Sequence, residues 1–150
     1  MPEILSHLLS SIRQMMQSAD IDHAILMSEK IDSQWFFYYK NQRIVNSFLF
    51  NYIKIQDKIG SKLFRAVLSH WREYDSDSMT MLDILNRLEK LRIIDAVETW
   101  DKLRELRNSI THEYPDDTDI RIANIRLALE AYLELKAIID NIERALLTHQ

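Results

Sequence analysis

The sequence of 150 residues contains no cysteine, a single glycine and only two prolines. The lack of cysteine excludes a disulfide framework and a zinc site built from thiolates, and it agrees with a reducing compartment. Strands joined by tight turns usually need more glycine and proline than this, so the scarcity favours long helices with few loops. Alanine, leucine, glutamate, lysine and arginine are frequent, and all are good helix formers.

The sequence also lacks any long apolar run and any excess of positive charge. No apolar segment approaches the roughly 20 residues that a helix needs to span a bilayer, so no membrane contact is expected. The start, Met1-Pro2-Glu3-Ile4, shows no basic leader before an apolar block, and we therefore expect no secretory signal and a cytoplasmic location. A formal net charge of −4 argues against a broad basic face for nucleic acid. Contact with a polyanion must then be local, or be made by more than one subunit.

The spacing of apolar residues predicts one all-α domain over residues 1–150, without repeats or linkers. Apolar side chains recur every three to four residues, as in amphipathic helices, over 3–17, 34–71, 81–91, 95–113 and 120–147. A break is expected at Ser18-Ala19-Asp20, followed by helix over about 21–31. Residues Asp116 to Asp119 are expected to cap the last helix. Because short loops between long helices favour antiparallel neighbours, we expect an up-and-down bundle of four to five helices.

Four local features sharpen this picture. Ser33 is expected to cap a long helix that begins at Gln34. Five consecutive aromatic residues, Trp35 to Tyr39, cover every side of a helix, which favours core packing plus a dimer contact over a base-stacking surface. Gly60 inside the same helix predicts a bend or a close helix crossing. The last helix is apolar on more than one side, which indicates a central position or a surface shared with a partner.

The residues with most chemical potential lie at the end of the helix predicted over 95–113. Arg107-Asn108-Ser109-Ile110-Thr111-His112-Glu113-Tyr114 contains a guanidinium, an amide, hydroxyls and an imidazole. At about 100° per residue, Arg107 lies on the flank of the apolar stripe nearest Trp100. Asn108 and His112, four residues apart, stack on a neighbouring face. The sequence therefore predicts that the last turns of this helix present these groups together.

This combination favours RNA cleavage by the neighbouring 2′-hydroxyl. Arginine offers a planar fork for phosphate oxygens and can stabilise the charge that builds on phosphorus. The carbonyls of a helix C-terminus favour the imidazolium of His112, whereas Arg107 opposes it, so the imidazole is expected to titrate near neutrality and to serve as acid or base. The sequence offers no carboxylate–histidine cluster with metal-ligand spacing, so no metal and no cofactor are expected.

The spacing Arg107-Asn108, three residues, His112, one residue, Tyr114 resembles the Arg-x4-His-x-Tyr signature of HEPN domains. It is most similar to the toxins encoded beside minimal nucleotidyltransferases in bacteria and archaea. The resemblance implies a metal-independent ribonuclease that acts as a homodimer, with the two motifs meeting in a cleft at the dimer interface. Arg107 and His112 would then be the catalytic pair, oriented by Asn108. Tyr114 would be the hydroxyl that the cognate nucleotidyltransferase antitoxin modifies with AMP, and the added charge would exclude RNA.

Simpler interpretations remain open for each of these residues. Arg107 can pair with Asp101, with Glu105 or with a carboxylate on another helix, and His112 can act as a helix C-cap. Tyr114 can simply pack against the end of the bundle. Two other functions also fit the sequence: a non-catalytic subunit that binds a nucleotidyltransferase or its substrate, and a structural helical adaptor.

Overall fold

A computed structural model describes residues 1–74, 77–112 and 117–148 of the chain. All regular structure within these ranges is helical, which confirms the all-α prediction. The elements are α1 (Glu3–Met27), α2 (Ser33–Phe37), α3 (Tyr39–Lys58), the π-helical turn η1 (Ile59–Leu63), α4 (Phe64–His70), α5 (Met81–Lys90), α6 (Val97–Thr111) and α7 (Thr118–Thr148). Since α3, η1 and α4 follow one another without a break, the described ranges contain six continuous helical segments, more than the four to five predicted.

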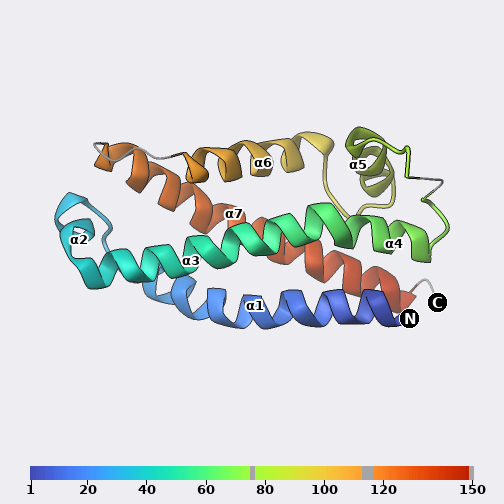
Figure 1. The fold of residues 1–150 in the computed structure, drawn as a ribbon, viewed down its shortest axis with the longest axis horizontal. Helices are drawn as coiled ribbons and strands as arrows, with labels where there is room; N and C mark the ends of the chain where they lie inside the picture. Colours follow the sequence, from blue (N-terminus) through green and yellow to red (C-terminus); the bar gives the residue numbers. More distant parts are fainter. Residues whose placement is uncertain (75–76, 113–116, 149–150) are drawn as a thin grey trace.

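The four long segments alternate in direction, as expected for an up-and-down bundle. Helix α1 runs along one edge, the α3–η1–α4 segment returns beside it, α6 runs back along the opposite edge, and α7 crosses diagonally to end near the start of α1 (Figure 1). Helix α7 contacts α1, α2, α3 and α6, so it has the central position that was one of the two alternatives for an apolar last helix. The short helices close the two ends, with α2 at one end and α5 packed on α4 and α6 at the other.

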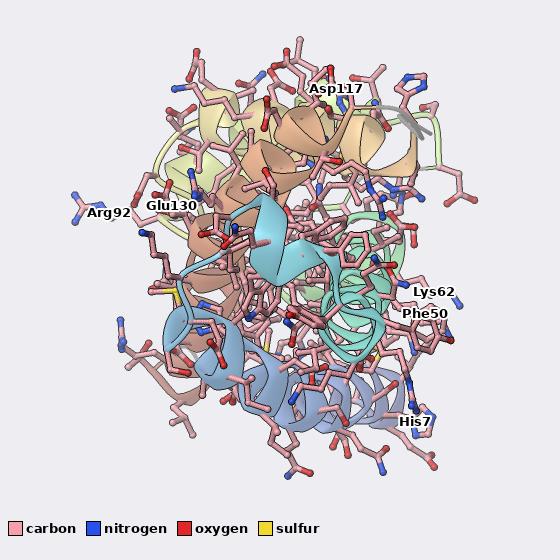
Figure 2. The ribbon with its side chains drawn as sticks, turned by 90° about the vertical axis from the view of Figure 1, so that its left-hand side faces the viewer. His7, Phe50, Lys62, Arg92, Asp117 and Glu130 are labelled. Atoms are coloured by element: carbon pink, nitrogen blue, oxygen red, sulfur yellow. The ribbon has the colours of Figure 1, made fainter. Side chains whose placement is uncertain are left out.

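The core lies where α1, α3, α4 and α7 face one another. The largest side chains that are fully buried there are aromatic: Phe48, Tyr52, Phe64 and Tyr132. Seen from the α2 end, charged side chains such as Lys62, Arg92, Asp117 and Glu130 lie on the outside, and Phe50 also projects outward (Figure 2). No helix in the described ranges is both long enough and apolar enough to cross a membrane.

Gly60 lies at a close helix crossing, as its sequence position predicts. It is part of η1, and a Cβ atom at this position would lie 2.8 Å from Cζ2 of Trp100 on α6. The Trp100 ring is buried and packs edge-on against Phe64, with their ring centroids 4.8 Å apart. The missing side chain therefore lets α6 approach the α3–η1–α4 segment, and this contact sets the position of the residues that follow Trp100 on α6.

The predicted break at Ser18-Ala19-Asp20 is wrong, because α1 continues unbroken through it. Ala19 is fully buried, and Asp20 finds partners on α7. The Tyr132 hydroxyl donates to Asp20 Oδ1 at 2.7 Å, and Lys136 Nζ donates to the same atom at 2.9 Å. Because the Asp20 side chain is hydrogen-bonded to a neighbouring helix, it does not compete for the backbone groups of α1, and the helix continues.

The predicted long helix starting at Gln34 is also wrong in its first turns. Asp32, and not Ser33, is the N-cap, since its carboxylate accepts from the Trp35 N–H at 2.9 Å. Tyr38 is extended, with ψ 129°, and separates α2 from α3. Only part of the aromatic run is used internally: Phe36 is buried and Trp35 packs on the core. The last three aromatics, at positions 37–39, remain exposed.

The ends of α6 and α7 lie close to their predicted positions. Helix α6 begins at Val97, two residues after the predicted Asp95. At the start of α7, Asp117 Oδ1 accepts from the Ile120 N–H at 3.0 Å, which confirms an acidic cap. Asp116, the first residue of the predicted cap, lies outside the described residues. Part of the apolar surface of α7 stays outside the core, since Leu127 is half exposed.

Candidate functional site

The predicted site residues lie on the last two turns of α6. The helix ends at Thr111, and His112 is the C-cap residue, with extended backbone and its N–H donating to the Ser109 carbonyl at 3.3 Å. Thr111 Oγ1 donates to the Asn108 carbonyl at 2.9 Å, so two polar groups satisfy carbonyls at the helix end. The side chains of Asn108 and His112 are exposed. Tyr114, the predicted site of modification, lies outside the described residues.

Arg107 forms a two-pronged ion pair with Asp57, at the end of α3. Its Nε donates to Oδ1 at 3.0 Å and its Nη2 to Oδ2 at 2.8 Å. This is the third of the partners that the sequence left open, a carboxylate on another helix. Asp101 instead accepts from Arg104 at 3.1 Å. The hydrogen bonds that Arg107 donates to the Asp57 carboxylate hold the pKa of Arg107 above its ordinary value, so the guanidinium stays charged.

The Arg107–Asp57 pair lies at the surface, and this limits its strength. The two side chains are 29% and 49% exposed. Ion pairs exposed to this degree stabilise a fold by about 0–1 kcal/mol, because water and salt screen them. A phosphate group that approaches Arg107 can therefore replace the carboxylate at a modest cost in free energy. Arg107 therefore has an ion-pair partner in this structure, but the pair is weak enough for Arg107 to bind a phosphate instead.

Within one protomer the predicted residues line two different hollows. Arg107 and Asn108 line a shallow one together with Asp57 and Gly60, over the crossing of α6 and η1. His112 lines a second hollow, enclosed by α2, α3 and the facing ends of α6 and α7. The structure thus brings Arg107 and Asn108 together but places His112 at a separate pocket.

The pocket that His112 lines contains polar residues that the sequence motif does not include. Arg121, in the first turn of α7, lies over the Phe36 ring with its guanidinium carbon 4.5 Å from the ring centroid. Asn124, one turn later, accepts from Ser109 Oγ at 3.4 Å. Asn46 on α3 completes the polar lining. The sequence indicates a role for Arg121 only through its place one turn after the predicted helix cap. In a helical hairpin, this place lies beside the end of the preceding helix.

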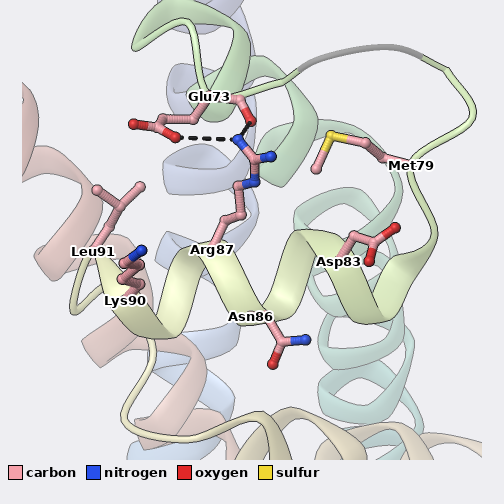
Figure 3. A pocket seen from close by; sticks show the side chains of 7 residues that line it. All are labelled: Glu73, Met79, Asp83, Asn86, Arg87, Lys90 and Leu91. Atoms are coloured by element: carbon pink, nitrogen blue, oxygen red, sulfur yellow. Dashed lines mark hydrogen bonds and ion pairs between the residues drawn. The ribbon is translucent and has the colours of Figure 1, made fainter.

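A third hollow, between α5 and the segment after α4, is a rival site. Its lining mixes both signs of charge: Glu73, Asp83, Arg87 and Lys90. Arg87 Nη1 donates to the Glu73 carbonyl oxygen at 2.8 Å and to its carboxylate at 3.2 Å (Figure 3). These bonds join α5 to the segment after α4, so Arg87 has a structural role in this hollow.

Residues that bind metals are not gathered anywhere in the described ranges. Over 1–74, 77–112 and 117–148, no three histidine, aspartate or glutamate side chains form a group that could hold a metal ion. The imidazole of His23, for example, contacts the Leu129 carbonyl oxygen at 3.0 Å and packs against the Tyr132 ring, so its role is structural.

No protein-family model, no curated protein and no solved structure matches this chain. What the protein does must therefore be inferred from the motif and from the geometry of its residues.

Proposed function

We propose that this protein is a metal-independent ribonuclease toxin of the HEPN type, neutralised by a cognate minimal nucleotidyltransferase. The observation that carries the proposal is the Arg-x4-His-x-Tyr spacing in the sequence, together with the placement of Arg107 in the last turns of α6 and of His112, the C-cap residue, with its side chain exposed at a pocket. The active species is a homodimer, and the RNA lies in the cleft between the two copies of the motif. The scarcity of positive charge agrees with such a site, because only a local cation faces the substrate.

The reaction is an attack of a ribose 2′-oxygen on the adjacent phosphorus. His112 accepts the 2′-hydroxyl proton, the new P–O2′ bond forms, and the P–O5′ bond breaks. The leaving 5′-oxygen takes a proton from a second imidazole, that of the partner subunit's His112. The products are a 2′,3′-cyclic phosphate and a free 5′-hydroxyl. Arg107 stabilises the extra negative charge on the phosphoryl oxygens, and Asn108 orients the pair.

Two features of the structure support a site shared between subunits. Arg107 and His112 line different hollows of one protomer, so neither hollow of a single copy contains both residues. The Arg107–Asp57 pair is partly exposed. A phosphate of an RNA that lies in the cleft between the subunits can therefore displace the Asp57 carboxylate from Arg107.

The test is incubation of the pure protein with total RNA in the presence of a chelator. The wild type is expected to cleave RNA, whereas Arg107→Ala and His112→Ala are expected to have lost the activity. Arg104→Ala is the matched control, because Arg104 is an exposed arginine on the same helix and pairs with Asp101. Cleavage that persists in both motif variants would overturn the proposal.

The silencing step has a separate test. Co-expression with the nucleotidyltransferase is expected to add the mass of one AMP to Tyr114, and Tyr114→Phe is expected to remain unmodified and toxic. A fully inhibited complex in which Tyr114 carries no AMP would show that the antitoxin acts by covering the site.

The second candidate is a non-catalytic subunit that binds a nucleotidyltransferase or its substrate. The observation that favours it is the two-pronged bond between Arg107 and Asp57, which gives the arginine a structural role. On this alternative the chain binds its partner and leaves RNA intact, with or without the motif substitutions.

A further inference from the structure

The pocket beside His112 has the composition of a nucleotide site. Its apolar lining residues, which are buried or half-buried and form its floor, are Val45, Leu49, Ile110 and Ile125. Its rim is polar and carries Asn46, Thr111, His112, Arg121 and Asn124. None of the described residues that line it is an aspartate or a glutamate. An apolar floor with a few convergent polar groups is the usual form of a small-molecule pocket.

Arg121 is the positive charge of this pocket. Its guanidinium lies over the Phe36 ring at 4.5 Å, and in the described ranges it forms no ion pair with a carboxylate. Asp117, directly before α7, uses its carboxylate to cap the Ile120 N–H. Stacking on an aromatic ring orients a guanidinium and leaves its N–H groups available to an anion.

We propose that this pocket binds one nucleotide of the RNA substrate, with Arg121 holding the phosphate next to the His112 imidazole and the base resting on the apolar floor between Asn46 and Asn124. Amide side chains offer both donors and acceptors to a base edge. The inference takes its substrate class from the proposed ribonuclease activity. It assigns Arg121, outside the Arg-x4-His-x-Tyr motif, as the residue that positions the phosphate.

This arrangement addresses a difficulty in the motif itself. Arg107 is bonded to Asp57 and lines another hollow, whereas Arg121 and His112 line the same one. Before any carboxylate is displaced, the guanidinium of Arg121 is therefore the cation that an incoming phosphate meets in the His112 pocket. Arg107 then contributes from the shared cleft.

The test is titration of the full-length protein with adenosine 3′-monophosphate, followed by calorimetry and by NMR of the histidine imidazoles. The nucleotide is expected to bind more tightly than adenosine or inorganic phosphate alone and to shift the His112 resonances. Arg121→Ala is expected to weaken binding roughly tenfold or more, the effect of losing a charge-assisted hydrogen bond. Arg121→Lys keeps the charge without the planar fork and should fall between the two.

Arg144→Ala is the matched control, because Arg144 is an exposed arginine near the other end of α7, and its binding should equal that of the wild type. If Arg121→Ala does not fold, Arg121→Lys and Asn46→Ala give the same comparison. Failure of the wild type to bind the nucleotide, or equal affinities for wild type and Arg121→Ala, would overturn the inference.

Steady-state cleavage of RNA separates this inference from the function on which it rests. If RNA is cleaved and Arg121→Ala leaves both KM and nucleotide affinity unchanged, the ribonuclease stands and the Arg121 site is wrong. If RNA is not cleaved by the wild type while the nucleotide binds in an Arg121-dependent way, the pocket stands and the ribonuclease is wrong. A raised KM with little change in kcat supports both.

Discussion

Substitution of Asp57 by asparagine should make this protein a better ribonuclease. In the free protein, Arg107 is held by two hydrogen bonds of 3.0 and 2.8 Å to the Asp57 carboxylate. Asparagine keeps the shape of the side chain but removes its charge, so Arg107 no longer has to leave an ion pair before it meets a phosphate. A pair with 29% and 49% exposed side chains is worth about 0–1 kcal/mol. Because 1.4 kcal/mol corresponds to a factor of ten, kcat/KM for RNA is expected to rise by up to about fivefold.

The assay is cleavage of a defined RNA in chelator over a range of substrate concentrations. Removal of any acidic group also favours a polyanion, so Asp101→Asn serves as the matched control; Asp101 pairs with Arg104 on the same helix as Arg107. Only the rise beyond this control reports release of Arg107. The double variant Asp57→Asn, Arg107→Ala should be inactive. An Asp57→Asn protein as inactive as Arg107→Ala would refute the reasoning, since it would show that the carboxylate is needed to hold Arg107 in place.

Two further predictions concern the fold that carries the site. Gly60→Ala should lower Tm, because the new methyl group would lie 2.8 Å from the buried Trp100 ring, and overpacking costs about 1–3 kcal/mol, more than the roughly 1 kcal/mol that alanine gains in a helix. A loss of 1 kcal/mol lowers Tm by about 2–4 °C in a chain of this size, which thermal melts can resolve. The control is Lys62→Ala, at an exposed position. An unchanged or raised Tm for Gly60→Ala would contradict the close contact between Gly60 and Trp100. Asp20→Asn should be destabilising at pH 7: burial opposes the charge of Asp20, but hydrogen bonds from Lys136 and Tyr132 outweigh it and hold its pKa below 3.8. Because the pKa of Asp20 is lower in the folded state, this stabilisation is present above pH 3.8 and is lost as the pH falls through the folded pKa. The Tm values of the wild type and the variant should therefore converge at acid pH. A difference in Tm that does not change with pH would contradict the hydrogen bonds to Asp20.

Local sequence patterns were sufficient where a single residue type settles the geometry. The only glycine in the chain, Gly60, falls inside an apolar helical pattern, and a glycine there is tolerated mainly when another helix needs the space. The structure places Trp100 in that space. The helical periodicity of the long segments predicted the all-α architecture for the same reason, since a stripe of apolar side chains must be buried against a neighbour.

The same patterns failed where a distant partner changes the preference of a local stretch. Ser18-Ala19-Asp20 looks like a break, yet Tyr132 and Lys136, more than a hundred positions later, satisfy Asp20 within a continuous helix. At Tyr38, in contrast, a helix that was predicted to be continuous is interrupted. Asn41 Nδ2 donates to the Trp35 carbonyl at 2.7 Å and stabilises the corner between α2 and α3, which the aromatic run does not predict.

The candidate site was predictable in its residues but not in its partners. The spacing of Arg107 and His112 is visible in the sequence, whereas the carboxylate bonded to Arg107 is 50 positions away on α3. Arg121 was missed for a related reason. Its relation to His112 depends on how the α6–α7 hairpin closes over Phe36, and no spacing rule connects an arginine on one helix with a pocket walled by three others.

The most direct test of the account is the chemistry of the cut ends. A short RNA, incubated with the wild-type protein in chelator, should give 2′,3′-cyclic phosphate and 5′-hydroxyl ends by mass spectrometry, and the same strand with one 2′-deoxy sugar at the cut should stay whole. Intact RNA in every sample, or cleavage of the deoxy strand to 5′-phosphate ends, would contradict the account.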